Sequence, residues 1–231
     1  MKRVLSLSIS AVLLAGCVGN TVPVANSGAS LRGKSITIVK KSYPKRPTIS
    51  TDANLIGSVV GGLIGGAIIA SAASKKYGVD GYSVPSNQIA ERLIGTIASR
   101  YSMNYIPNAK VSNVSKGLNA LSSNPNREDK NSYKNLYSTD YLLDVDTPDW
   151  IMNHTTMFTD KAFFVMTNSV KIVNRLTGKA VASVGCKYKK EWEGNIPKYE
   201  DILANNQQFI KDYTQKAIDA CIAKAKREML K

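Results

Sequence analysis

Hydrophobic and polar residues alternate along two stretches in the C-terminal half of the chain, Phe163–Asn174 and Lys179–Glu191. This period of two is typical of strands that bury one face. A Leu-Thr-Gly turn lies between the two stretches, so they predict an antiparallel hairpin. Upstream, Thr139–Trp150 predicts a further strand that ends at Pro148, and the β-branched run Ser35–Lys41 predicts the first strand.

Apolar residues recur with the helical period in Pro85–Arg100 and again from Tyr199 to about Leu230. Pro85 suits the first turn of the earlier helix. The order of these elements predicts an α+β fold. We expect a two-layer sandwich in which helices cover one face of a mostly antiparallel sheet, with a long C-terminal helix.

The stretch Leu55–Ser74 contains no charged residue. Its glycines recur every four residues and would form a smooth ridge on a helix; they are Gly57, Gly61, Gly62, Gly65 and Gly66. One interpretation is a helix packed tightly in the core of the domain. The other is a glycine zipper that inserts in a membrane or joins subunits. Five glycines and three serines make the stretch weakly hydrophobic for a membrane span, which favours the first interpretation.

The N-terminus has the organisation of a secretory signal peptide. Lys2 and Arg3 precede an apolar run from Val4 to Leu14, and small residues precede Cys17. The ending Leu-Leu-Ala-Gly-Cys resembles the lipobox of bacterial lipoproteins, which implies cleavage before Cys17 and acylation of that residue. We therefore predict a signal peptide over residues 1–16, a lipidated flexible tether over 17–33 and a single periplasmic domain over 34–231. Val18 follows the cysteine where lipoproteins retained in the inner membrane often carry Asp, which favours the outer membrane.

Composition and charge narrow the possible partners. The chain has 231 residues, 43% of them hydrophobic, which is enough for one folded domain with a proper core. Its net charge of +14 would suit nucleic acid, but the predicted export argues against that partner. We expect the bilayer itself, reached through acylated Cys17, and an envelope protein, anionic lipid or lipopolysaccharide as further partners. An oligomer is also compatible with the sequence.

Two cysteines remain besides Cys17. Cys186 lies on the apolar face of the strand over Lys179–Glu191, and Cys221 lies on the apolar stripe of the C-terminal helix. Exported proteins meet an oxidising environment, so we predict a disulfide between the two rather than a pair of buried thiols.

Several stretches resemble an uncharacterised family of proteobacterial lipoproteins. The resemblance is carried by Asp140–Trp150, the turn Leu176-Thr177-Gly178, Gly185–Tyr188, Lys198–Asn206 and Cys221, together with the Gly/Ala-rich segment. It implies a lipoprotein with the Cys186–Cys221 pair, and it implies no activity, substrate or site.

Candidate chemistry is sparse. His154 is the one histidine, which argues against a zinc site or a catalytic triad, and we expect it to be a surface or hydrogen-bonding residue. Asp144, Asp146 and Asp149 could hold calcium or act on a glycan, but solvent-facing strand and turn positions explain them more simply. Trp150 could stack on a sugar ring, as could Trp192. We expect no metal and no cofactor.

The sequence therefore predicts a non-enzymatic, membrane-anchored lipoprotein with a structural or partner-binding role in the cell envelope. A membrane-active oligomer built on Leu55–Ser74 is the main alternative. A peptidoglycan- or glycan-binding or hydrolysing module is a weaker one.

Overall fold

The computed structural model describes residues 28–42, 44–51, 82–107, 111–112, 133–134, 136–155 and 161–230. Cys17 and the predicted signal peptide lie outside the described residues, as does the glycine-rich stretch 55–74. The predictions for these two segments therefore stay predictions.

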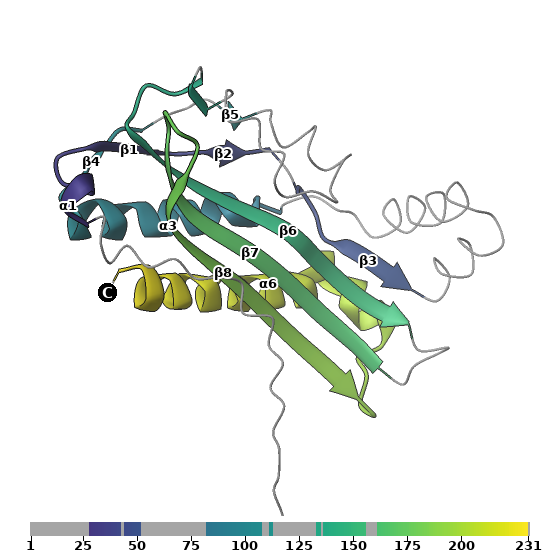
Figure 1. Ribbon diagram of the computed structural model, residues 1–231. Coiled ribbons are helices and arrows are strands. Elements are labelled where there is room, and N and C mark those ends of the chain that lie inside the picture. The colour runs from purple at the N-terminus through teal and green to yellow at the C-terminus, as the bar shows by residue number, and fades with distance from the viewer. Residues whose placement is uncertain are drawn as a thin grey trace, which may run out of the picture.

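The described elements form an α+β fold, which confirms the predicted class (Figure 1). In chain order they are α1 (Gly28–Leu31), β1 (Ser35–Ile38), β2 (Lys40–Lys41), β3 (Thr48–Thr51), α3 (Pro85–Arg100), β4 (Asn104–Tyr105), β5 (Val111–Ser112), β6 (Tyr141–Thr155), β7 (Lys161–Asn174), β8 (Ala180–Glu193) and α6 (Tyr199–Met229). Within this described part, one sheet has six strands in the order β4-β1-β6-β7-β8, with β3 also beside β6. A small second sheet pairs β2 with β5.

The three longest strands form an antiparallel meander, as the alternation predicts. β6 pairs with β7 and β7 with β8, and the β7–β8 hairpin turns at Gly178, whose φ of +64° suits glycine. The predicted end of β6 at Pro148 is wrong. The register shifts between Asp146 and Asp149, so a bulge takes up the proline and the strand continues to Thr155.

Short parallel strands complete the sheet on the other side of β6. β1 pairs in parallel with Tyr141–Leu143, and β3 pairs in parallel with Ile151–His154. The β3 strand directly follows Pro44 and Pro47, a pair of prolines that is typical of a loop. Its pairing to β6 overrides that local signal, because strand propensity depends strongly on context.

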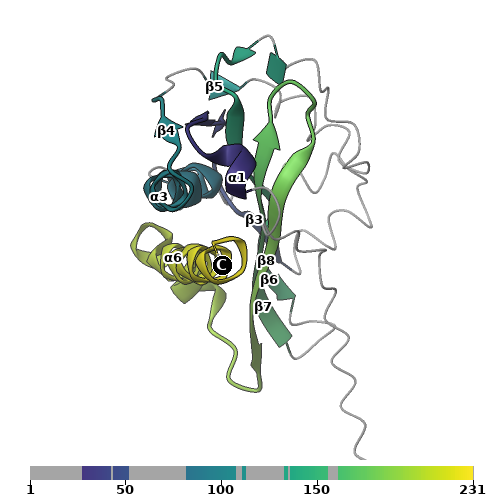
Figure 2. The ribbon, with the colours of Figure 1, turned by 60° about the vertical axis from the view of Figure 1, so that its left-hand side comes forward.

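Helices α3 and α6 lie side by side on one face of the sheet, which gives the predicted two layers (Figure 2). Apolar side chains from both helices and from the facing strand positions form the main core, including Ile89, Leu93, Phe164 and Ile218. Leu31 of α1 is also fully buried in this core. The folded domain therefore begins earlier than predicted and includes residues that we assigned to the tether.

Helix α6 is interrupted near its start. Ala204 has an extended backbone, and Asn205, Asn206 and Gln207 have positive φ values between 50° and 59°. Asparagine tolerates this left-handed region better than most residues, so the Asn-Asn pair suits the break. The single continuous helix that the periodicity predicts is thus two helical segments. In the described residues no helix has the length and apolar character to cross a membrane.

Candidate functional site

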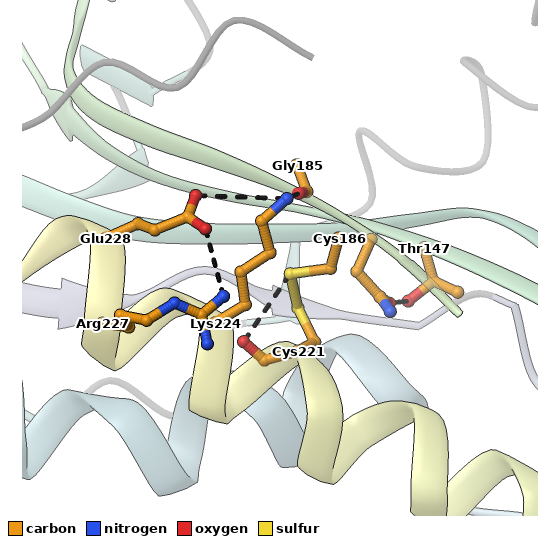
Figure 3. Close-up of a disulfide and its surroundings, with 8 residues drawn as sticks. Thr147, Gly185, Cys186, Cys221, Lys224, Arg227 and Glu228 are labelled. Carbon is orange, nitrogen blue, oxygen red and sulfur yellow. Dashed lines mark hydrogen bonds and ion pairs between the residues drawn. A yellow bond between two sulfur atoms is a disulfide. The ribbon is translucent and has the colours of Figure 1, made fainter. Parts of the chain in front are cut away.

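A disulfide joins the layer of helices to the sheet. Cys186 on β8 bonds to Cys221 on α6, with an S–S distance of 2.06 Å and a Cα–Cα distance of 5.3 Å (Figure 3). Both residues are buried. This confirms the predicted pairing, and it holds α6 against the outermost strand of the meander.

Lys224 reaches the same strand one helical turn after the disulfide. Its Nζ donates a hydrogen bond of 2.8 Å to the backbone carbonyl oxygen of Gly185, and it lies 4.0 Å from a carboxylate oxygen of Glu228 (Figure 3). The β8 backbone is therefore tied to α6 at two successive residues, once covalently and once through a charge-assisted hydrogen bond.

A buried charge cluster lies on the opposite face of the sheet. Lys41 of β2 places its Nζ 2.7 Å from Oδ1 of Asp144 and 2.9 Å from Oδ1 of Asp146, both on β6. The side chains of Lys41 and Asp144 are 6% and 0% exposed, whereas that of Asp146 is 37% exposed. The expectation that Asp144 faces solvent is wrong, because Lys41 supplies the charge that makes its burial tolerable.

Two tyrosines cover this cluster. Tyr133 donates a hydrogen bond of 2.5 Å to Oδ2 of Asp144. Tyr133 and Tyr137 also pack in a small second hydrophobic core, which contains Val39, Leu142 and Val173 as well. Leu142 and Asp144 are two residues apart on one strand, so this second core and the charge cluster share the face that the helices do not cover.

The environment shifts the pKa of each of the three charged groups. Burial lowers the pKa of Lys41, but Asp144 and Asp146 raise it by more, so Lys41 stays protonated. Burial raises the pKa of Asp144, but Lys41 and the Tyr133 hydroxyl outweigh it and leave this pKa below its usual value. The pKa of Asp146 is raised, first by burial and then by the neighbouring Asp144.

Asp149 does not belong to this cluster. It lies beyond the bulge, and its Oδ2 accepts a hydrogen bond of 2.6 Å from Thr167 Oγ1. The three aspartates that we considered together are thus divided between an internal ion cluster and a cross-strand hydrogen bond. In the described part of the chain, no group of His, Cys, Asp and Glu side chains is placed to hold a metal ion.

The other candidate residues have structural contacts. His154 Nε2 lies 2.9 Å from the carbonyl oxygen of Pro197. Trp150 is 3% exposed, and its Nε1 donates a 2.9 Å hydrogen bond to Thr214. Trp192 is partly buried against Phe209. Neither Asp144 nor Trp150 can therefore contact a glycan in this conformation, which removes two of the residues proposed for glycan binding.

Sequence reasoning missed Lys41 and Tyr133. Lys41 is the last residue of the predicted first strand, and its alternation with Thr37 and Val39 could have placed it on the same face as Asp144. Tyr133 follows a polar stretch without periodic pattern, so nothing in the sequence pairs it with β6.

No family model matches the chain, and no curated protein matches it. Among solved structures, lipoprotein GNA1162 from Neisseria meningitidis has 11% identity and a TM-score of 0.30, covering 80% of this chain and 99% of its own. The C-terminal domain of LpoB from Salmonella enterica has 11% identity and a TM-score of 0.25, covering 68% and 83%. Protein XCC0632 from Xanthomonas campestris has 9% identity and a TM-score of 0.36, covering 85% and 88%.

These similar structures include a bacterial lipoprotein. The low TM-scores assign neither a fold family nor a function. The resemblance to proteobacterial lipoproteins therefore remains a prediction.

Proposed function

We propose that this chain is a non-enzymatic lipoprotein of the cell envelope, held at the outer membrane through acylated Cys17, with a structural or partner-binding role. One observation carries the non-enzymatic part. Among the described candidate residues, Asp144 is buried against Lys41, and the part-buried His154 lies within hydrogen-bond distance of the Pro197 carbonyl oxygen, so both have structural contacts. The lipobox-like ending before Cys17 supports the anchor. Two or three acyl chains together hold a protein firmly at a bilayer, since each buried methylene contributes about 0.8 kcal/mol.

The anchor is tested by labelling cells with an alkyne analogue of palmitate. The wild-type chain should take up the label and fractionate with membranes, and Cys17→Ala should lose both properties. Cys221→Ala is the matched control, because it removes a cysteine outside the lipobox and should keep the label. Unlabelled wild-type protein would reject the anchor.

The choice of membrane is tested separately. Val18→Asp should move the protein from the outer to the inner membrane on a density gradient. If both forms sediment with the inner membrane, the outer-membrane assignment fails while the anchor stands.

A second candidate function is a membrane-active oligomer built on residues 55–74. One structural observation favours it. Thr51 at the start of the intervening segment pairs with His154 on β6, and Tyr82 just after that segment packs against Trp150 on the same strand with ring centroids 5.2 Å apart. The two described residues that flank this segment thus both lie along the same half of β6.

This candidate predicts that Gly61→Leu shifts the mass measured by light scattering in mild detergent. Gly95→Leu is the matched control, because Gly95 is an exposed helical glycine whose added side chain would meet open space. An unchanged mass for Gly61→Leu would reject the zipper.

A further inference from the structure

Strand β8 ends the described sheet and offers an edge. It pairs with β7 from Ala180 to Glu193, and no described strand lies along its other side. The carbonyl of Gly185 is occupied by Lys224, and the disulfide fixes the next residue. The part of the edge that no described strand, Lys224 or disulfide occupies therefore runs from Lys187 to Glu193.

The contact at Gly185 indicates which backbone groups point outward. In an antiparallel pair, the N–H and C=O of one residue point to the same side of its strand, and successive residues alternate. Because the Gly185 carbonyl is available to Lys224, residues 187, 189, 191 and 193 also direct their N–H and C=O groups away from β7. The carbonyl oxygen of Glu193 already accepts a 2.8 Å hydrogen bond from the backbone N–H of Asn195, and the other outward groups of this run can hydrogen-bond an additional strand.

The side chains of the same four residues carry an ordered charge pattern. Lys187, Lys189, Glu191 and Glu193 are all exposed and lie on the sheet face opposite the helices. Along the strand the charges read plus, plus, minus, minus. Within one copy, the carboxylate of Glu191 forms an ion pair with Lys189, and the carboxylate of Glu193 forms one with Lys161 of β7.

The charges of this run complement those of a second copy of the same run when the two strands lie antiparallel. In an antiparallel pairing of two copies centred on residue 190, Lys187 lies opposite Glu193 of the second copy and Lys189 opposite Glu191. The reciprocal pairs are the same, so all four outer-face positions join opposite charges. A shift of the centre to residue 188 places Lys187 opposite Lys189, and a shift to 189 places Lys189 opposite itself. The register with matched charges also pairs the outward backbone groups with each other.

The helix-side residues of this run fit the same register. Tyr188 and Trp192 are partly buried and lie two positions on either side of Lys190. Centred on residue 190, Tyr188 of one copy lies opposite Trp192 of the other, and aromatic cross-strand pairs stabilise antiparallel strands. Lys190 lies opposite Lys190 of the second copy. Its Nζ is placed over the ring of Trp192, 5.8 Å from the ring centroid.

We infer that the chain forms a two-fold dimer in which residues 187–193 of β8 pair antiparallel with the same run of a second copy. The six-stranded sheets of the two copies then become one continuous sheet, with α6 of each copy on the same face. The interface is isologous, as expected for a closed dimer. Lys224 and the disulfide mark where the pairing stops. The inference does not depend on the lipid anchor or on residues 55–74.

The register is tested by one cysteine at the two-fold axis. Residue 190 faces its own copy in a pair without backbone hydrogen bonds, where Cα atoms are about 4.5 Å apart, a separation that a disulfide can bridge. The full chain carrying Lys190→Cys, expressed with its own signal peptide, should therefore form a disulfide-linked dimer on a non-reducing gel. Lys179→Cys is the matched control, because it lies in the same hairpin outside the paired run and should stay monomeric. The wild-type chain controls for bonds through Cys17.

A charge exchange tests the pairing without a new thiol. Lys189→Glu places two like pairs at the interface and should weaken the dimer about tenfold by analytical ultracentrifugation of the full chain in detergent. Glu191→Lys should do the same, and the double exchange should restore the wild-type dimer. Three results would overturn the inference. They are a Lys190→Cys dimer yield no higher than that of Lys179→Cys, single charge variants that dimerise like wild type, and a Lys190→Cys chain that is disulfide-linked to a different protein instead of its own copy.

Discussion

Replacing Lys41 by Met removes the charge that compensates Asp144 while preserving most of the side-chain volume. Asp144 is fully buried, and Lys41 Nζ lies 2.7 Å from its Oδ1. Removing one partner of a buried ion pair costs roughly 3–5 kcal/mol, because the remaining charge is left in a poorly solvated place. For a domain of this size, each kcal/mol shifts the melting temperature by about 2–4 °C, so the expected loss is roughly 6–20 °C at pH 7.

The loss should depend on pH. In the wild-type protein the pKa of Asp144 is below its usual value, so its stabilising contribution is intact above pH ~3.9 and is lost only below it. In the Met variant, burial without Lys41 raises the pKa of Asp144 above its unfolded value. The carboxyl then takes up a proton at a higher pH than in the wild type, which relieves the buried charge as the pH is lowered. The difference in stability between wild type and variant should therefore shrink with falling pH.

The assay is thermal and urea unfolding, followed by circular dichroism at pH 7 and pH 5 with the disulfide intact. Lys40→Met is the matched control, because its neighbouring ion pair with Glu91 spans 3.1 Å between side chains that are 38% and 51% exposed. An exposed pair of this kind contributes about 0–1 kcal/mol. Equal losses for the two variants would refute the reasoning, as would a Lys41→Met deficit that stays constant or grows at pH 5.

Two further predictions concern single contacts. Cys186→Ala combined with Cys221→Ala should lower the free energy of urea unfolding by ~3–4 kcal/mol, because the bond closes a loop with a sequence separation of 35. A loss equal to that of the reduced wild-type protein would support this, and no loss would contradict it. Tyr133→Phe should cost about 1–3 kcal/mol in the same assay, since it removes the hydroxyl that donates to Asp144. Tyr137→Phe should cost nothing or stabilise, because that buried hydroxyl has no hydrogen-bond partner in the described structure; equal costs would count against the assignment.

The features that sequence reasoning predicted share a short-range or periodic signal. The β7–β8 hairpin follows from alternation over more than ten residues with a Gly turn, and the disulfide follows from two cysteines on apolar faces in an exported chain. Strand β3 and the Lys41–Asp144 pair depend instead on parallel pairing between distant segments. Such pairing leaves no local pattern, because strands of two to four residues are too short for an alternation to be visible.

The environment of Asp144 was predicted incorrectly for a similar physical reason. An aspartate in a strand usually marks the solvent side, and Asp144 does lie on the face away from the helices. That face is nevertheless covered there, by Tyr133 from a stretch without sequence pattern. The sequence therefore predicted the correct face of β6 and the wrong environment for the carboxylate.

The two aspartates at the start of β6 explain how the short β1–β6 pairing is held. This parallel pairing covers only Ile36 to Ile38. Just before it, Oδ2 of Asp140 accepts 2.8 Å hydrogen bonds from both N and Oγ of Ser35. Just after it, Asp144 binds Lys41. A slip of β1 by one residue against β6 would turn Ile36 and Ile38 away from the core beneath the helices and would move Lys41 out of reach of Asp144, so the ion pair helps to specify the register as well as adding stability. A carboxylate that fixes the register of a sheet and never meets solvent is suited to architecture rather than to acid–base chemistry, which is why the charge cluster supports a structural role.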